Sequence, residues 1–297
     1  MMSTRTIELD QALGFAIPSR SARGRLVRLG PTLDAVLSAH AYPPAIEALL
    51  AEALTLVALV GSTLKDAGGQ LTMQTRSEHG VVQLLVCDYR GGEVRGYVQY
   101  DADRLAQAPE SPTLFALFGQ GYLAITFDLA ATGERYQGIV PLDGETMAEA
   151  VESYFTQSEQ IPTLVRIGIR RDGGTHVAGG LFLQHLPEGE DGRERLHTRL
   201  DHPEWHHVEA LGATMGADEL ADAALPLEML VWRLFNEEAD VRVLARTPLS
   251  RGCRCTPNYI ASVLVKFSEE ERREMADDQG IISVDCAFCA TKFPIEA

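Results

Sequence analysis

The sequence predicts an α+β fold with three parts: a mixed strand and helix core, a helical linker and a small C-terminal module. Three observations carry this prediction. Strand-like segments bounded by glycine turns alternate with two long helical segments. A polar stretch then breaks the pattern near residue 187, and four of the five cysteines lie after residue 252. With 297 residues, the chain is long enough for about two domains.

The first long helix is expected from about Pro43 to Lys65, because apolar residues recur there every three or four positions. Two prolines precede it and the glycines of 66–69 follow it. Strands are expected at 70–77, 81–90 and 93–100, with a Gly-Gly turn between the last two.

The pattern continues with a second hairpin and a second helix. We expect the hairpin at 121–142, turning near Thr132 and Gly133, and the helix at 144–160. Two more strands are expected between 163 and 185, around a turn at 172–174. The core domain is therefore expected to span residues 1–185.

The linker is expected at 186–245 and the C-terminal module at 246–297. The segment 187–207 is charged and polar, which is typical of a boundary. The clearest linker helix is predicted at 226–239, where one stripe is apolar. Because Met229 and Trp232 make the opposite face apolar too, we expect this helix to be covered on most sides. The stripe consists of Leu227, Leu230, Val231, Leu234 and Phe235.

The net charge and the N-terminal sequence indicate which partners and which cellular compartment to expect. Its formal net charge is −16, which repels phosphate backbones and anionic lipid, so neither a nucleic-acid nor a membrane partner is expected. The N-terminus lacks the apolar stretch of a secretory signal, and the apolar window at 53–64 is too short to span a bilayer. A cytoplasmic protein is expected, and in a reducing compartment clustered cysteines favour metal or redox chemistry over structural disulfides.

The cysteines form a C-x-C pair, Cys253 and Cys255, and a C-x-x-C pair, Cys286 and Cys289. Two such pairs can form a closed tetrahedral site for one zinc ion per chain. Between them we expect a helix with Ser268 as N-cap, Glu271 completing a capping box and Gly280 after its end. Since this module has few apolar residues, much of its folding free energy must come from the metal.

The spacing leaves several functions open. One is a permanent structural zinc module, and another is a redox switch in which oxidation removes the ligands and unfolds the module. A nucleic-acid zinc ribbon is a third, against which the acidic segment 268–278 counts. A zinc-dependent thiol–disulfide oxidoreductase that uses Cys286 and Cys289 is a further alternative.

Other candidate site residues give weaker evidence of a metal or catalytic site. Cys87 is expected to be a buried strand residue. No nucleophile–base pair or carboxylate pair has catalytic spacing, so an enzyme is not expected. A histidine group near Asp201 and Glu204 offers metal ligands, but a polar linker accounts for it better. Its members are His197, His202, His206 and His207.

With both cysteine pairs located, the chain resembles the Hsp33 family of redox-regulated holdase chaperones. The resemblance rests on the cysteine spacing, on "SEQIPT" (158–163) and "RLFNEE" (233–238), and on the long stretches 48–74, 94–100 and 230–244. Two departures lie beside the cysteines. Thr256 and Pro257 stand where Ser and a charged residue are common, and Ala290 stands in place of the usual Asn.

The resemblance implies an activation scheme. The four reduced cysteines hold zinc in an inactive protein, and oxidants release the zinc and form Cys253–Cys255 and Cys286–Cys289 disulfides. The module and the linker then unfold, unfolding client proteins bind without ATP, and the active form is a homodimer. The resemblance assigns client binding and dimerisation to the 1–185 core domain. The apolar stripe of the linker helix would supply client-binding residues.

Overall fold

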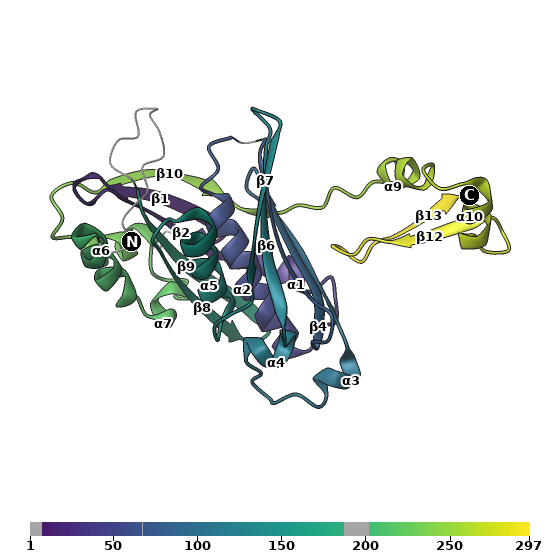
Figure 1. Ribbon diagram of the computed structural model, residues 1–297, viewed down its shortest axis with the longest axis horizontal. Helices are drawn as coiled ribbons and strands as arrows, with labels where there is room; N and C mark the ends of the chain where they lie inside the picture. Colours follow the sequence, from purple (N-terminus) through teal and green to yellow (C-terminus); the bar gives the residue numbers. More distant parts are fainter. Residues whose placement is uncertain (1–7, 67, 187–201) are drawn as a thin grey trace, which may run out of the picture.

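The computed structural model describes residues 8–66, 68–186 and 202–297, and it confirms the α+β class (Figure 1). Two large, mostly antiparallel sheets form the body of the molecule, and a small third sheet belongs to the C-terminal module. In the five-stranded sheet the order is β10 (Arg242–Pro248), β1 (Gln11–Ile17), β2 (Ala22–Leu29), β9 (Thr175–His185) and β8 (Thr163–Asp172).

The six-stranded sheet contains the predicted hairpins. Its order is β11 (Ser250–Arg251), β5 (Glu93–Tyr100), β4 (Val82–Arg90), β3 (Gln70–Ser77), β6 (Gly121–Leu129) and β7 (Glu134–Pro141). The Gly91–Gly92 turn joins β4 to β5, and both glycines have positive φ, which this tight connection requires.

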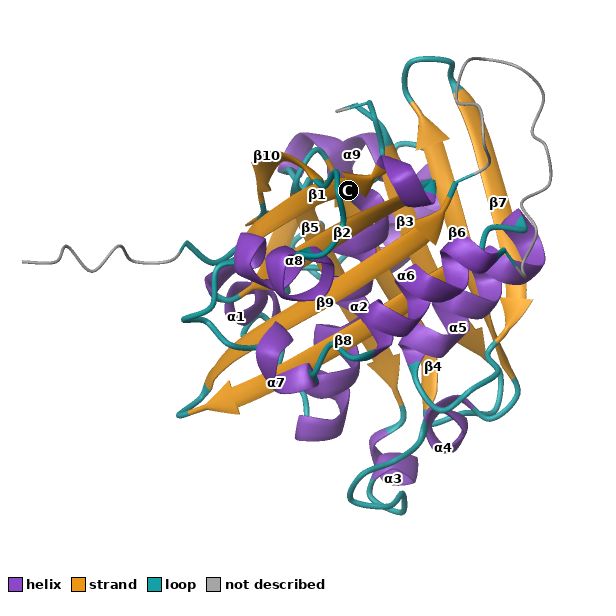
Figure 2. Cartoon of the chain, turned by 90° about the vertical axis from the view of Figure 1, so that its left-hand side faces the viewer, coloured by secondary structure: helices purple, strands orange, loops and turns teal. Residues whose placement is uncertain are grey.

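The two sheets pack on opposite sides of helix α2 (Pro44–Gly61), which contacts strands of both (Figures 1 and 2). Helices α1 (Pro31–Leu37) and α5 (Met147–Tyr154) join α2 in this middle layer. The helix predicted at 144–160 ends earlier than expected, since a π-helical turn at Phe155–Glu159 follows α5. Short helices α3 (Ala102–Leu105) and α4 (Leu114–Phe118) lie in the connection from β5 to β6.

Helix α2 is longer than the apolar window 53–64 indicated. Among the described residues, it is the helix whose length and composition would suit a membrane span, with 18 residues and a mean hydropathy of 1.7. However, 72% of that window is buried inside the protein, as in the core helix of a globular domain. Its apolar character is therefore explained by contact with two sheets at once.

The linker helices cover the other face of the five-stranded sheet. Helices α6 (Pro203–Ala213), α7 (Ala217–Leu220) and α8 (Leu227–Phe235) form a second hydrophobic core there with β1, β2, β8 and β9. The ring centroids of Phe15 and Phe235 are 5.7 Å apart in this core. The sequence analysis did not predict strands β1 and β2.

The expected coverage of the 226–239 helix is wrong on one side. Its predicted stripe is buried, but Met229 is 41% and Trp232 is 62% exposed, so one face is open to solvent. Apolar composition on both faces had suggested full cover, whereas the sheet covers only one. The helix is also shorter than expected, since Pro226 is its N-cap residue and it ends at Phe235.

The proposed division at residue 246 falls inside a strand. Strand β10 pairs with β1, and β11 pairs in parallel with β5, so the chain from 242 to 251 is part of both large sheets. Beyond it, the module consists of α9 (Pro257–Leu264), α10 (Glu269–Met275), β12 (Ile281–Asp285) and β13 (Lys292–Glu296). It projects from the body on the side of the six-stranded sheet (Figure 1).

Candidate metal centre

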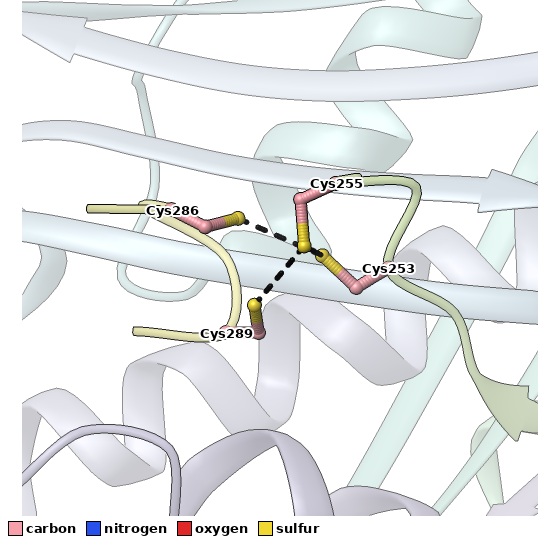
Figure 3. A group of neighbouring side chains, drawn as sticks. All are labelled: Cys253, Cys255, Cys286 and Cys289. Atoms are coloured by element: carbon pink, nitrogen blue, oxygen red, sulfur yellow. Dashed lines mark hydrogen bonds between the residues drawn. The ribbon is translucent and has the colours of Figure 1, made fainter. Parts of the chain in front are cut away.

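The four cysteines come from two turns of the module that lie far apart in the sequence. Cys253 and Cys255 lie between β11 and α9, and Cys286 and Cys289 lie in the turn between β12 and β13. Their sulfur atoms point toward one another (Figure 3). The structure thus brings together all four predicted metal ligands.

The sulfur positions suit a single tetrahedral metal ion. The Sγ atoms of Cys253 and Cys255 are 3.0 Å apart, those of Cys253 and Cys286 are 3.6 Å apart, and those of Cys255 and Cys289 are 3.3 Å apart. All four lie within 4.8 Å of one another, and all four are free thiols. Tetrahedral thiolates at about 2.3 Å from zinc have sulfur–sulfur separations of about 3.8 Å. Small shifts would therefore accommodate the ion.

The turn at 286–291 is held by backbone hydrogen bonds. The N–H of Cys286 donates to the carbonyl of Thr291 at 3.0 Å, and the N–H of Ala290 donates to the carbonyl of Cys286 at 2.8 Å. Ala290 adopts a left-handed conformation with φ of 55°. Asn and Gly adopt this conformation more readily than Ala, which gives a physical reason for the Asn that is usual at this position and makes Ala290 the less favourable residue.

The first cysteine pair leads directly into helix α9. Thr256 is its N-cap, with a side chain that accepts a hydrogen bond from the N–H of Tyr259 at 3.1 Å, and Pro257 is its first residue. Thr-Pro is therefore a helix start signal here, and leaves Cys253 and Cys255 outside the helix. The capping box of Ser268 and Glu271 is confirmed, but α10 ends at Met275, so Gly280 belongs to a later turn.

The electrostatics of the four thiols are uneven. Burial, together with hydrogen bonds to the neighbouring thiols, raises the pKa of Cys255 and of Cys286. Burial acts against ionisation of Cys289 as well, but hydrogen bonds with the side chain and backbone of Thr291, together with those from Cys255 and Cys286, outweigh it and lower its pKa to about 6. One thiolate therefore forms readily, and its charge disfavours further ionisation unless a cation is present.

The module has little hydrophobic core of its own. Its fully buried apolar cluster consists of Ile260, Leu264 and Ile282, with four partly buried residues around it. Two further apolar residues of the module, Val265 and Phe267, are 71% and 39% exposed. A core of this size supplies little stability, so the centre is the main candidate for the missing free energy.

The other predicted sites behave differently. Cys87 is fully buried in β4, as expected, and burial raises its thiol pKa. His197 and Asp201 lie outside the described residues. Within the described parts of the chain, no histidine joins a group of three or more converging metal ligands. His207 instead lies 2.8 Å from a carboxylate oxygen of Glu238.

The stripe of the linker helix lies in the second hydrophobic core, in a part of the fold separate from the cysteines. All five side chains are at most 8% exposed. They are Leu227, Leu230, Val231, Leu234 and Phe235. Their burial agrees with the prediction, and their role in client binding stays a prediction.

Sequence reasoning missed the contacts that place the module against the body. Phe288 and Arg254, each lying between two cysteines, contact residues of β3 and β5. The available signal was the alternation of polar and apolar residues in 70–77 and 93–97, which marks one face of these strands as polar. That signal does not identify what covers the polar face.

Comparison with known proteins places this architecture. The family model described as Hsp33 protein matches residues 10–296. The chain belongs to the Hsp33 family. Among curated Hsp33 relatives, the 33 kDa chaperonin of Caulobacter vibrioides is 39% identical over 97% of this chain and 95% of its own length. The 33 kDa chaperonin of Yersinia pestis is 34% identical, covering 97% and 92% of the two chains.

A solved Hsp33 structure has the same fold. The crystal structure of the 33 kDa chaperonin (heat shock protein 33 homolog) from Thermotoga maritima matches with a TM-score of 0.76. The match covers 97% of this chain and 95% of the other, at 23% identity. The α+β class and the order of core, linker helices and C-terminal module are thus those of the Hsp33 family.

Proposed function

We propose that this Hsp33 family member is an ATP-independent holdase chaperone whose client binding is controlled by oxidation of a zinc centre. The observation that carries the proposal is the convergence of four free thiols within 4.8 Å, in a module with only three fully buried apolar residues. A module built in this way depends on its ligands, so chemistry at the sulfurs controls its folding.

In the reduced state, the ligands of one Zn²⁺ per chain are Cys253, Cys255, Cys286 and Cys289. Zinc suits this donor set because four soft thiolates without an oxygen or nitrogen donor form a closed tetrahedral site. In this state helices α6, α7 and α8 of the linker stay folded on the core domain, and the five apolar side chains of α8 remain covered.

Oxidation would convert the ligands to disulfides. Each pair of thiolates loses two electrons to an oxidant such as hypochlorite or peroxide, which is reduced, and one sulfur–sulfur bond forms. Following the scheme of the family, the pairs are Cys253–Cys255 and Cys286–Cys289. Disulfide sulfur is a poor ligand, so zinc leaves and the 246–297 module unfolds.

Strands β10 and β11 give the module a direct route to the rest of the fold. They lie between the linker helices and Cys253, and they pair with β1 and β5. Unfolding of the module frees the end of this segment, which weakens the pairing of β10 and the cover over α8. The exposed apolar stripe then binds unfolding proteins, and the oxidised chain forms a homodimer.

The expected partners and compartment follow from the net charge and from the thiol chemistry of the cysteines. A net charge of −16 disfavours nucleic-acid and membrane partners, and a reducing cytoplasm would keep the thiols ready for oxidation. As a holdase, each chain would bind a limited amount of client, so the suppression of aggregation would be proportional to the amount of the protein. An oxidoreductase using Cys286 and Cys289 would instead turn over many substrate disulfides per chain.

The test measures zinc release and aggregation of a thermally unfolding client in the same samples, over a series of hypochlorite doses. We expect both to rise together, with about one zinc released per chain and suppression of aggregation that saturates near stoichiometric protein. Cys87→Ser is the matched control, since it removes a buried thiol outside the centre and should respond like the unmodified protein. Full suppression before any zinc is released would contradict the proposal.

A further inference from the structure

The outer face of the six-stranded sheet carries a row of polar side chains beneath the metal module. Gln70 and Thr72 lie on β3, Asp88 on β4, and Arg95 and Tyr97 on β5. Register places Thr72 opposite Asp88 and Asp88 opposite Arg95, so the row crosses three adjacent strands. We call these five residues the docking platform.

The platform is a connected hydrogen-bond network. The amide Nε2 of Gln70 donates to Thr72 Oγ1 at 3.1 Å, and Thr72 Oγ1 donates to Asp88 Oδ1 at 2.7 Å. Arg95 donates through Nε to Asp88 Oδ2 at 2.8 Å, and its Nη2 lies 2.6 Å from the same oxygen. Both carboxylate oxygens of Asp88 are thus occupied, and the guanidinium of Arg95 is held in place.

Asp88 is buried although it lies on the face of the sheet turned away from α2. Cys87, its neighbour on β4, points to the helix side, where its sulfur packs near Leu50 and Leu54 of α2. Successive strand residues point to opposite faces, so Asp88 points outward, yet it is only 3% exposed. A paired carboxylate covered in this way indicates that another part of the protein lies over it.

The cover comes from the residues between the metal ligands. Phe288, between Cys286 and Cys289, lies with its ring centroid 4.0 Å from Cζ of Arg95 and 4.9 Å from the ring of Tyr97. Arg254, between Cys253 and Cys255, donates through Nη1 to Oε1 of Gln70 at 2.5 Å. The residue between the two cysteines of each pair therefore contacts one end of the platform.

We propose that the docking platform is a recognition surface for the metal-bound form of this chain's own module. This inference rests on the proposed function, because it assumes that an ion holds the four cysteines together. Arg254 and Phe288 are 34 positions apart in sequence. Their spacing matches the two ends of the platform while the four sulfurs share one ion.

Metal loss would uncouple the two contacts. Once the cysteine pairs separate, Phe288 and Arg254 no longer bind as one unit. Each contact alone is weak, because each must then offset the entropy lost in ordering its own segment. The module then leaves the sheet and exposes the Asp88–Arg95 pair. The platform is thus the surface through which the core domain responds to the state of the cysteines.

The test uses substitutions at Phe288 in full-length, reduced, zinc-loaded protein. Phe288→Leu keeps an apolar side chain but removes the ring over Arg95, whereas Phe288→Tyr keeps the ring. Phe267→Leu is the matched control, because Phe267 belongs to the same module and is 39% exposed. Three quantities are measured: zinc content, maximum dimension by small-angle scattering, and amide exchange at Ser250 and Gly252.

Those two amides report on docking because they donate to β5 and to the turn before it. The N–H of Ser250 bonds to the carbonyl of Gly92 and that of Gly252 to the carbonyl of Val94, both at 3.0 Å. In Phe288→Leu we expect one zinc per chain, a larger maximum dimension and exchange faster by about 3- to 30-fold, the range of a cation–π contact. Phe288→Tyr and Phe267→Leu should match the unmodified protein.

Two results would overturn the inference. One is unchanged scattering and exchange in Phe288→Leu. The other is unchanged exchange at Ser250 and Gly252 after chelation of zinc from the unmodified protein. The holdase proposal is judged separately by client aggregation, so a Phe288→Leu protein that undocks but never binds clients would support the platform and contradict the proposed function.

Discussion

Arg28, on strand β2, donates its Nε to the backbone carbonyl of Leu220 at the end of helix α7, at 3.0 Å. The same guanidinium also donates to the carbonyls of Glu219 and Leu225, and the side chain is only 1% exposed. Burial lowers its pKa to about 10, which leaves it charged at neutral pH. One core residue thus satisfies three carbonyls of the linker, two at the end of α7 and one in the connection from α7 to α8.

We therefore expect Arg28→Met to release the linker. One buried and two partly buried carbonyls would lose their donor, which costs about 2–4 kcal/mol of linker docking free energy. Limited proteolysis of the reduced protein should show faster cleavage across 217–235. Arg135→Met is the control, since its side chain is 71% exposed and far less packed. Equal cleavage rates in the two variants would show that Arg28 does not hold the linker.

Loss of the second cysteine pair should abolish metal binding. In a Cys286→Ser, Cys289→Ser double variant, two of the four thiolates are replaced by hydroxyls, which are weak zinc ligands. We expect zinc content after treatment with a competing chelator to fall from about one per chain to none. Cys87→Ser should keep its zinc. Tight zinc in the double variant would place the site elsewhere.

Zinc loss, rather than disulfide formation, should be the structural trigger. Disulfides across one or two residues close very short loops and restrict the unfolded chain only slightly. Removal of a Cys₄ zinc ion withdraws about 10–16 kcal/mol from a module with three fully buried apolar residues. Chelation under reducing conditions should therefore unfold residues from about 253 onward while α2 keeps its protection. Amide exchange measures this, and persistent protection of 281–296 without metal would refute it.

Substitution of Ala290 should stabilise the metal-bound module. Its φ of 55° is unfavourable for Ala, so Ala290→Gly should add about 0.5–1 kcal/mol, or roughly 2- to 5-fold in zinc affinity. Chelator competition measures the change. Ala287→Gly is the control in the same turn, because Ala287 lacks a positive φ and should gain nothing. A gain of similar size at both positions would exclude the conformational explanation.

Linker docking should weaken in acid through Glu238. Hydrogen bonds from Arg20, and then from His207, hold the pKa of this carboxyl below its usual range, and Arg20 similarly lowers the pKa of Glu204 on α6. A pKa depressed in the folded state contributes stability above the unfolded value, about 4.3 for Glu. That stability is lost as pH falls through the folded value.

The buried Trp205 on α6 provides the measurement, in a Trp232→Phe background that removes the exposed tryptophan. Acid titration of its fluorescence should show a loss of linker docking that is shallower in Glu238→Gln, since this variant has no carboxylate to protonate. The groups that face Glu238 are Arg20 and His207, and both remain in the variant. If the fluorescence of Glu238→Gln and of its parent changed identically as pH fell, the Glu238 carboxylate would contribute nothing to linker docking.

The sequence alone determined the features that depend on local pattern. Helix α2, the β3–β5 hairpins and the capping box at Ser268 were predicted because spacing, glycine turns and caps act within a few residues. The metal ligands were predicted for the same reason, since two tight cysteine pairs need only one ion to meet. The resemblance of the cysteine spacing and of "RLFNEE" to one family also follows from sequence.

Tertiary structure decided the features that depend on what lies across the fold. Met229 and Trp232 have an apolar neighbourhood in sequence, yet only the sheet contact decides that they stay exposed while Leu230 is buried. Strand β10 crosses the expected boundary between linker and module, and its pairing with β1 needs a partner more than 220 residues away. Asp88 and Phe288 show no local relationship at all, because their contact through Arg95 exists only when the module lies on the sheet.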